Sequence, residues 1–324
     1  NQMVRKIALN SAYGALANQY FAFFSVDLAE AITTSGQLII QWSERTINEF
    51  MNKTLGTEDE DFVIAMDTDS VYITMDKLVQ KVLPEETDKG KIIDFLNKSE
   101  GMFEKVLADG FDDLAEYTNA FQQKMEMGRE VIADRGIWTA KKRYILNAWD
   151  VEGVRYKEPS LKIMGIEAVK SSTPAPCREK IKEALKIIMS GDEKQLNDFI
   201  QEFRKEFTSL PVEDIAFPRS VNGLSKFRDS ASIYRKGCPM HIKGSLVYNH
   251  MINEKRLTHK YPAIQDGDKI RFIQLRQPNP LGVNVISFIT KVPKELDIHK
   301  YIDYDTQYEK AFVEPLTFIT DNIQ

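Results

Sequence analysis

Two aspartates one residue apart, Asp67 and Asp69, lie between the apolar runs 62–66 and 71–75, which are rich in β-branched residues. Such runs around a short acidic tripeptide predict a tight hairpin with carboxylates at its tip. Residues i and i+2 of an extended segment project to the same side, so the two carboxylates are expected to converge. Their oxygens suit Mg²⁺, which is usually held by one or two carboxylates plus substrate phosphates. An ordinary polar turn is the alternative for this tripeptide alone.

A second group of polar residues shares one face of a helix predicted over residues 3–18. Lys6, Asn10 and Tyr13 follow the i, i+4, i+7 spacing of one helical stripe, and Gly14 comes next. A cation, an amide and an aromatic ring on one stripe indicate a binding face, and the glycine lets a flat group approach the backbone. A surface helix whose Tyr13 packs into the core is the alternative.

Positive charge gathers in two stretches of a chain with a net charge of −5. Residues 129–170 hold nine basic and six acidic residues, and residues 226–271 hold ten basic and four acidic ones, which leaves −14 for the remainder. Segregated basic faces attract phosphate backbones, although a merely solvated face is the alternative for either stretch. The first stretch contains Lys141-Lys142-Arg143-Tyr144, expected on a strand that projects basic side chains.

Length and composition indicate a globular protein of one large domain or two ordinary ones. The chain has 324 residues, of which 43% are hydrophobic and 28% charged. It has no apolar run of about 18 residues, so we expect no membrane span, and we expect no secretory signal. Its two cysteines, Cys177 and Cys238, form no disulfide framework, which fits a reducing compartment. Because the first residue is Asn1 and it stands inside a helical pattern, we expect either a fragment or one part of a divided protein.

The remaining pattern predicts helices around a small number of strands. A long helix is expected from Asp27, in a capping-box-like D-L-A-E, to Gly56, with Leu28 and Ile32 on its buried face. Residues 76–127 are expected to be mostly helical, with breaks near Pro84 and Gly110. The other expected elements are strands at 129–134, 138–146 and 161–166, helices at 174–208 with a break at 190–191, a helix at 240–253, and strands at 268–275 and 283–289.

Three motifs in this order resemble elements of family B DNA polymerases. Residues 6–14 (K-x-x-x-N-S-x-Y-G) resemble the fingers-helix element that faces the incoming nucleotide, residues 67–70 (D-T-D-S) resemble the palm hairpin, and residues 141–144 (K-K-R-Y) resemble the element behind it. In detail the chain is similar to the polymerases of T-even-type tailed phages, through residues 161–165, 171–174 and 238–244. The resemblance covers essentially the whole chain.

The resemblance implies an α+β fold with an antiparallel palm sheet and packed helices, followed by a mainly helical thumb with a small β portion. It assigns residues 1–17 to the C-terminal part of the fingers helix, 18–164 to the C-terminal half of the palm, and 165–324 to a thumb that grips duplex DNA. The implied activity is that of a DNA-directed DNA polymerase, which adds dNTPs to a primer 3′ end by nucleotidyl transfer with two Mg²⁺ ions.

The resemblance also implies roles for single residues. Asp69 would be the catalytic metal ligand, with Asp67 beside it as an auxiliary carboxylate. Lys6 would contact the triphosphate of the dNTP, and Asn10, Tyr13 and Gly14 would line the pocket of the nascent base pair. The residues expected to face primer-template DNA are Lys142 and Tyr144, with Lys141 and Arg143 in support, and Lys170 and Lys243 in the thumb.

One part of the family pattern is missing. The second catalytic aspartate comes from a D-x-x-S-L-Y-P-S element that precedes the fingers, and the only look-alike here starts at Asp229, after the hairpin. We therefore expect the chain to be inactive without an N-terminal half that supplies this aspartate and the exonuclease. The chain ends in F-I-T-D-N-I-Q, unlike the clamp-docking peptide of the family, so clamp binding through this chain is not expected. A phage-encoded polymerase would act in the host cytoplasm.

Three other interpretations explain part of the pattern. A D-x-D nucleotide-sugar glycosyltransferase would use Asp67 and Asp69 but would leave Lys6 and residues 141–144 unexplained. A non-catalytic DNA-binding module would use the basic stretches alone. Cys238 and His241 have half of a zinc-site spacing, without a second pair nearby.

Overall fold

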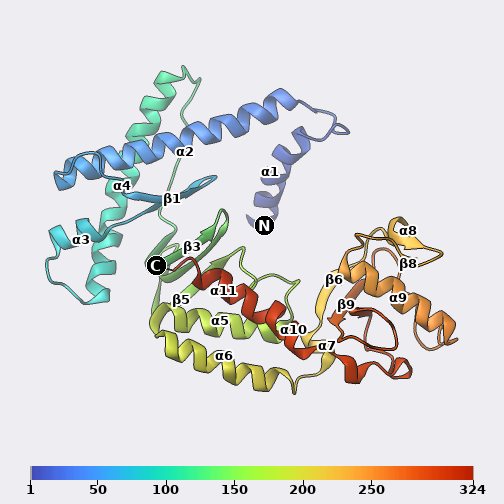
Figure 1. The fold of residues 1–324 in the computed structure, drawn as a ribbon. Helices are drawn as coiled ribbons and strands as arrows, with labels where there is room; N and C mark the ends of the chain where they lie inside the picture. The colour runs from blue at the N-terminus through green and yellow to red at the C-terminus, as the bar shows by residue number, and fades with distance from the viewer. Residues whose placement is uncertain (1, 324) are drawn as a thin grey trace. The chain divides into compact units, whose positions relative to one another are not determined.

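The computed structural model describes residues 2–323 and contains two compact units (Figure 1). Unit 1 is the chain up to Ile132 together with Trp149–Glu158, and unit 2 is Ala133–Ala148 together with the chain from Pro159 onward. Helices predominate and the sheets are small and antiparallel, which confirms the predicted α+β class. No helix among the described residues is both long and apolar enough to cross a membrane.

Unit 1 is built on two long helices and a hairpin. Its elements are α1 (Gln2–Leu16), α2 (Val26–Leu55), β1 (Val63–Asp67), β2 (Ser70–Ile73), α3 (Asp76–Val82) and α4 (Lys89–Tyr117). The N-cap of α2 is Ser25, whose hydroxyl accepts from Leu28 N, and not the predicted Asp27. Gly56 ends the helix with φ 76, as predicted.

The core of unit 1 lies where α2 and α4 pack against the hairpin. Ile47, Met51, Phe62 and Phe111 are buried there. The predicted break at Gly110 is wrong, because α4 continues through this glycine. A Cβ on Gly110 would lie 2.8 Å from Thr46 Oγ1, so the glycine allows the two helices to approach closely.

The N-terminal half of α2 is not covered in the described chain. Leu28 and Ile32, predicted on the buried face, are 56% and 49% exposed, and Phe23 and Val26 beside them are also exposed. We call these four residues the apolar face. The buried stripe of α2 starts later and runs through Ser43, Ile47 and Met51, with Ala29 as the one buried residue near the start of the helix.

A three-stranded sheet of order β3-β4-β5 follows, with β3 (Val131–Ala140), β4 (Arg143–Val151) and β5 (Val154–Met164). The predicted boundary between the strands 129–134 and 138–146 is wrong. One strand runs to Ala140, the chain turns at Lys141 and Lys142, and the next strand begins at Arg143. Lys142 has φ 61, a left-handed conformation that ends the strand.

Unit 2 consists of a helical part and a second sheet. Its longer helices are α5 (Ala175–Ser190), α6 (Glu193–Phe207) and α9 (Met240–Glu254), and its sheet has the order β10 (Val285–Phe288), β9 (Lys269–Gln274), β6 (Phe217–Ser220). The predicted helices and strands in this region are thus confirmed. The short elements are α7 (Val212–Ile215), α8 (Leu224–Phe227), β7 (Arg228–Asp229), β8 (Ile233–Tyr234), and the 3₁₀ turns η1 (Lys294–Leu296) and η2 (His299–Tyr301). The last described elements are α10 (Tyr304–Tyr308), the π-helical turn η3 (Glu309–Val313) and α11 (Glu314–Thr320).

An aromatic cluster joins α6 to the C-terminal helices of unit 2. The rings of Phe203 and Phe312 lie 4.7 Å apart and those of Phe207 and Tyr308 lie 5.2 Å apart, in edge-to-face geometry. The Tyr308 hydroxyl donates to Ile200 O at 2.6 Å, and burial raises its pKa. Helix α6 therefore packs against α10 and η3, and α5 contacts both α6 and η3.

Acid is expected to weaken one contact of unit 2. Glu295 accepts hydrogen bonds from Lys260 and from the Tyr261 hydroxyl, and the bond from Lys260 is the main reason that the pKa of Glu295 falls to about 2. A carboxylate whose pKa is lowered by folding stabilises the protein above its unfolded pKa, and the effect is lost as pH falls through the folded value. We expect Glu295→Gln to be less stable than the parent at pH 6, with the difference shrinking between about pH 4.5 and pH 2.

Thermal unfolding of both proteins across this pH range measures the effect. Asp297→Asn is the matched control, because it removes the same charge from an exposed ion pair with Lys300 in the same region. A difference between Glu295→Gln and the parent that does not vary with pH would contradict the assignment.

Candidate functional site

The predicted acidic hairpin is present, but its tip is not extended. Asp67 pairs with Ser70, and Thr68 and Asp69 form the turn between them. Thr68 has φ 56, and Asp69 N donates to Asp67 O at 2.6 Å, which closes a γ-turn on Thr68. The same-side argument for Asp67 and Asp69 is therefore wrong, because it assumed strand geometry. A β-branched residue at positive φ is costly, and such strain often marks functional sites.

The two carboxylates differ in surroundings. Asp69 is exposed at the tip, whereas Asp67 is half-buried and accepts a hydrogen bond from the Thr68 hydroxyl at 3.0 Å. Carboxylate oxygens are the donors that Mg²⁺ prefers, so the pair fits this metal in its chemistry. Within residues 2–323, no group of three or more His, Cys, Asp or Glu side chains could hold a metal ion.

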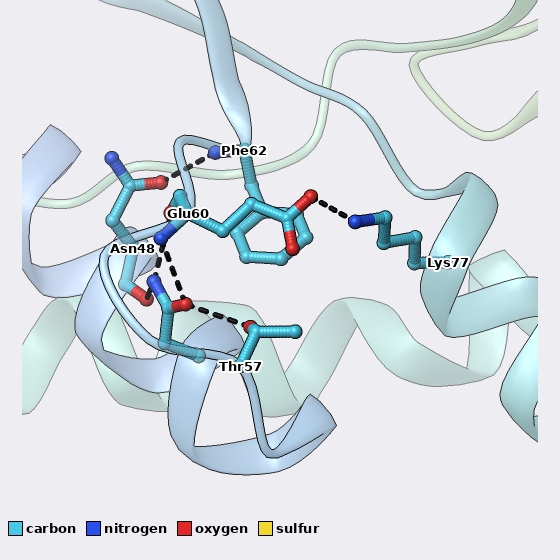
Figure 2. Close-up of polar contacts among 6 residues, drawn as sticks. Asn48, Thr57, Glu60, Phe62 and Lys77 are labelled. Atoms are coloured by element: carbon cyan, nitrogen blue, oxygen red, sulfur yellow. Dashed lines mark hydrogen bonds and ion pairs between the residues drawn. The ribbon is translucent and has the colours of Figure 1, made fainter.

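Two asparagines of α2 fix where the hairpin begins (Figure 2). Asn48 Oδ1 accepts from Phe62 N at 2.8 Å, directly before β1. Asn52 donates to Glu60 O at 2.8 Å and accepts from Glu60 N and from the Thr57 hydroxyl. Glu60 also pairs with Lys77 of α3. Hydrogen bonds to the strand backbone therefore anchor the hairpin to α2.

The polar stripe of α1 lies on an exposed surface. Lys6, Asn10 and Tyr13 lie within one helix at the predicted spacing, and all three are exposed. A Cβ on Gly14 would meet nothing within 4 Å, so the surface at this glycine is open. The alternative in which Tyr13 packs into the core is wrong for the described chain, because this side chain is 42% exposed.

The four residues of the K-K-R-Y motif have different environments. Lys141 and Lys142 are exposed at the β3–β4 turn. Arg143 is half-buried and donates to Glu167 Oε2 at 2.6 Å. Tyr144 is only 7% exposed, and its ring lies 6.4 Å from that of Trp138. The two lysines are therefore the most accessible members of the motif, and the predicted DNA contact of Tyr144 is limited to a small exposed part.

The two predicted thumb lysines both have partners within unit 2. Lys170 Nζ donates to Glu167 Oε1 at 2.8 Å. Lys243 Nζ donates to Asn284 Oδ1 at 2.9 Å and lies 5.0 Å from the centroid of the Tyr234 ring. Their contact with duplex DNA stays a prediction.

Charge counting overstated the free basic surface of residues 129–170. At least five of the nine basic side chains donate to protein acceptors, namely Arg129, Arg135, Arg143, Arg155 and Lys170. Sequence reasoning missed most of these partners because they lie far away along the chain, as Asp150 does from Arg129 and Glu167 from Arg143. It also missed Asn48 and Asn52, although asparagines at i, i+4 inside a helix are a usable signal, since they favour bonding to nearby backbone.

Two weaker candidates have structural explanations. The Asp229 carboxylate accepts from Ala231 N and from the Ser232 hydroxyl, and the backbone bond from Ala231 is the main reason that its pKa is lowered. This aspartate therefore shapes the β7–β8 turn. Burial lowers the pKa of His241 and raises that of Cys238, and neither belongs to a metal-binding group among the described residues.

Comparison with known proteins gives one consistent result. The model of DNA polymerase family B matches residues 1–84. The chain is 38% identical over 330 residues to the DNA-directed DNA polymerase of Enterobacteria phage T4, and 40% identical over 334 residues to that of Escherichia phage RB69. Both alignments cover 98% of this chain and 36% of the relative.

A more distant similarity extends beyond phages. The DNA polymerase alpha catalytic subunit of Trypanosoma brucei brucei is 22% identical over 277 residues, which is 84% of this chain and 18% of that protein. The chain thus spans about a third of the length of the two phage relatives.

Proposed function

Because the chain belongs to the T4-type family B DNA polymerases, we propose that it forms part of a DNA-directed DNA polymerase and contributes to its nucleotidyl-transfer site. The observation that carries the proposal is the strained hairpin, which presents Asp69 at an exposed tip with Asp67 beside it. The 38–40% identity over 98% of the chain supports it. The glycosyltransferase alternative accounts for the hairpin only.

In the proposed reaction, Asp69 is the main ligand of the catalytic Mg²⁺ and Asp67 is an auxiliary carboxylate. When bound, a pair of such ions lowers the barrier for attack of the primer 3′-hydroxyl and stabilises the leaving pyrophosphate. The chain's own part is to hold the carboxylates in place, through the γ-turn on Thr68 and the anchoring of β1 to α2.

Residues on α1 and at the β3–β4 turn would contact the substrates. Lys6 would neutralise charge on the dNTP triphosphate, and Asn10, Tyr13 and Gly14 would line the pocket of the new base pair. Lys142 would reach the minor groove of primer-template DNA, with Lys141 beside it. That groove presents a degenerate pattern, so such contacts report base-pair shape with little sequence preference, as templated synthesis requires.

The rest of the polymerase is the proposed partner of the apolar face. Leu28 and Ile32 lie about one turn apart on α2, and together with Phe23 and Val26 near its start they expose large apolar side chains. Exposed apolar patches in proteins often mark interaction sites. The relatives are nearly three times as long as this chain, since it covers 36% of each. We assign the face to the part of the polymerase that carries the other catalytic aspartate and the exonuclease.

Reconstitution tests the proposal. The chain is mixed with a separately produced remainder of the polymerase, and Mg²⁺-dependent extension of a labelled primer is measured. We expect extension only from the mixture, and binding of the chain alone to primer-template DNA that weakens from 50 to 200 mM salt. A chain that neither binds DNA at low salt nor restores extension overturns the proposal. DNA binding without extension by the mixture would favour the non-catalytic DNA-binding module.

Two variants of α2 test whether the apolar face binds the rest of the polymerase. Ile32→Glu places a charge on the apolar face, whereas Gln37→Glu adds the same charge at an exposed polar position of α2. We expect Ile32→Glu to weaken association with the remainder of the polymerase at least about tenfold, because a buried unpaired charge is costly, and Gln37→Glu to leave it unchanged. Equal effects of the two variants would contradict the assignment.

If the polymerase is phage-encoded, it acts in the host cytoplasm.

A further inference from the structure

The turn between β3 and β4 is tied at both of its ends. We call Lys141 and Lys142, which form this turn, the basic turn; both side chains are exposed, and Lys142 has φ 61. The residues on either side are joined to each other, because the Thr139 hydroxyl donates to Arg143 O at 3.3 Å. The side chain of Arg143 donates to Glu167 Oε2 at 2.6 Å, which connects the start of β4 to the segment after β5.

The segment after β5 also contacts the basic turn through its backbone. Gly165 has φ 65, and a Cβ at this position would lie only 2.2 Å from Lys142 O. No side chain fits in this space, so the glycine backbone lies directly against the turn. Two residues further on, Glu167 accepts from both Arg143 and Lys170, the latter at 2.8 Å.

The other support of Arg143 comes from a helix near the C-terminal end. The guanidinium carbon of Arg143 lies 4.7 Å from the ring centroid of Phe318 in α11, within cation–π distance. Arg143 Nε is buried and has no hydrogen-bond partner among the described residues. The Phe318 ring therefore stabilises the guanidinium group of Arg143, whose hydrogen bonding is incomplete.

We propose that Arg143 is a positioning residue for the basic turn and that Phe318 holds Arg143 in place. The charge of Arg143 is already matched by Glu167, so its main effect is to fix the conformation in which Lys141 and Lys142 are presented. The inference rests on the proposed function in one respect, since it takes the basic turn to contact primer-template DNA. Helix α11 thereby controls the order of a DNA-contacting turn that is far from it in sequence.

Hydrogen exchange of the free chain tests the support without any DNA. In Phe318→Ala, amides in peptides covering residues 139–146 should exchange about three- to fivefold faster, as expected for loss of one exposed cation–π contact. Phe318→Leu keeps apolar bulk without the ring face and should behave like Phe318→Ala, whereas Phe318→Tyr should restore the parent rate. An unchanged turn in Phe318→Ala overturns the proposal, as does full protection in Phe318→Leu.

The affinity of the chain for DNA provides a second test, because the positioning role and simple electrostatics predict opposite changes in affinity. Glu167→Gln removes a negative charge, so electrostatics alone would strengthen binding to primer-template DNA. The positioning role predicts the opposite, about threefold weaker binding, because the basic turn loses its conformation. Asp305→Asn is the matched control. Asp305 pairs with Arg204 within unit 2, and this substitution removes the same charge as Glu167→Gln.

Two results would separate failure of this inference from failure of the proposed function. Glu167→Gln that binds DNA as tightly as Asp305→Asn, or more tightly, overturns the positioning role while the proposed function stands. A parent chain that does not bind DNA at all overturns the proposed function, and hydrogen exchange then decides on the support of Arg143 by itself.

Discussion

Asp69→Asn in the reconstituted polymerase is expected to lower the rate of primer extension by about 10³-fold or more. The substitution keeps the size of the side chain and removes the charge that a divalent metal needs, and metal stabilisation of the transferring phosphoryl group is worth several kcal/mol. Asp69 is exposed at the turn, so the fold itself should not depend on its carboxylate. Single-turnover extension at saturating dNTP measures the loss in the chemical step.

The control for this variant is another exposed aspartate of unit 1. Asp59 lies in the loop before the hairpin, and its side chain is exposed like that of Asp69. Asp59→Asn should extend primers at the parent rate. Asp67→Asn should have a smaller effect than Asp69→Asn, because Asp67 is half-buried and bonded to Thr68. Parent-like extension by Asp69→Asn would show that this carboxylate is not the metal ligand.

The hairpin itself could be predicted from sequence, but the shape of its tip could not. Alternating β-branched residues on either side of D-T-D-S specify two strands, and β1 and β2 are indeed paired. The conformation of Thr68 depends on how the two strands close, and a β-branched residue gives no local signal for φ 56. Sequence periodicity therefore located the carboxylates, while the backbone between them required the folded structure.

The environments of the basic residues show a second limit of sequence reasoning. Lys6, Asn10 and Tyr13 were correctly placed on one exposed stripe, because helical spacing decides this locally. Arg143 was predicted as a supporting DNA contact, and its pairing with Glu167 depends on how β5 returns beside the β3–β4 turn. Counting charges along the chain cannot tell a free cation from a paired one.

The apolar face shows a third limit, of a different kind. Leu28 and Ile32 follow the helical period that predicts a buried stripe on this side of α2. The described chain does not cover it. A helical period of apolar residues specifies one side of a helix, but it does not specify which segment packs against that side.

Asp150→Ala is expected to lower the free energy of unfolding by about 3–5 kcal/mol, the largest effect on stability predicted for this chain. Asp150 is 1% exposed, accepts from Arg129 at 2.6 Å, and also accepts from Gly153 N in the β4–β5 turn. Its removal leaves Arg129 half-paired, with Glu100 of α4 as its remaining carboxylate partner among the described residues. Urea unfolding of the variant and the parent measures the difference.

A second arginine–aspartate pair of unit 1 provides the control for Asp150→Ala. Arg155 pairs with Asp94 at side-chain exposures of 40% and 58%, so Asp94→Ala should cost less than about 1 kcal/mol. The contrast follows from burial, because water screens the exposed pair and replaces its lost contact, whereas Asp150 is almost completely shielded from water and Arg129 is only 17% exposed. Replacing both partners, as Arg129→Met with Asp150→Leu, should recover part of the loss, since the buried carboxylate and its arginine are then both absent and Glu100, which also loses Arg129, is 32% exposed to water. Equal losses for Asp150→Ala and Asp94→Ala would show that burial does not set the strength of the Arg129 contact.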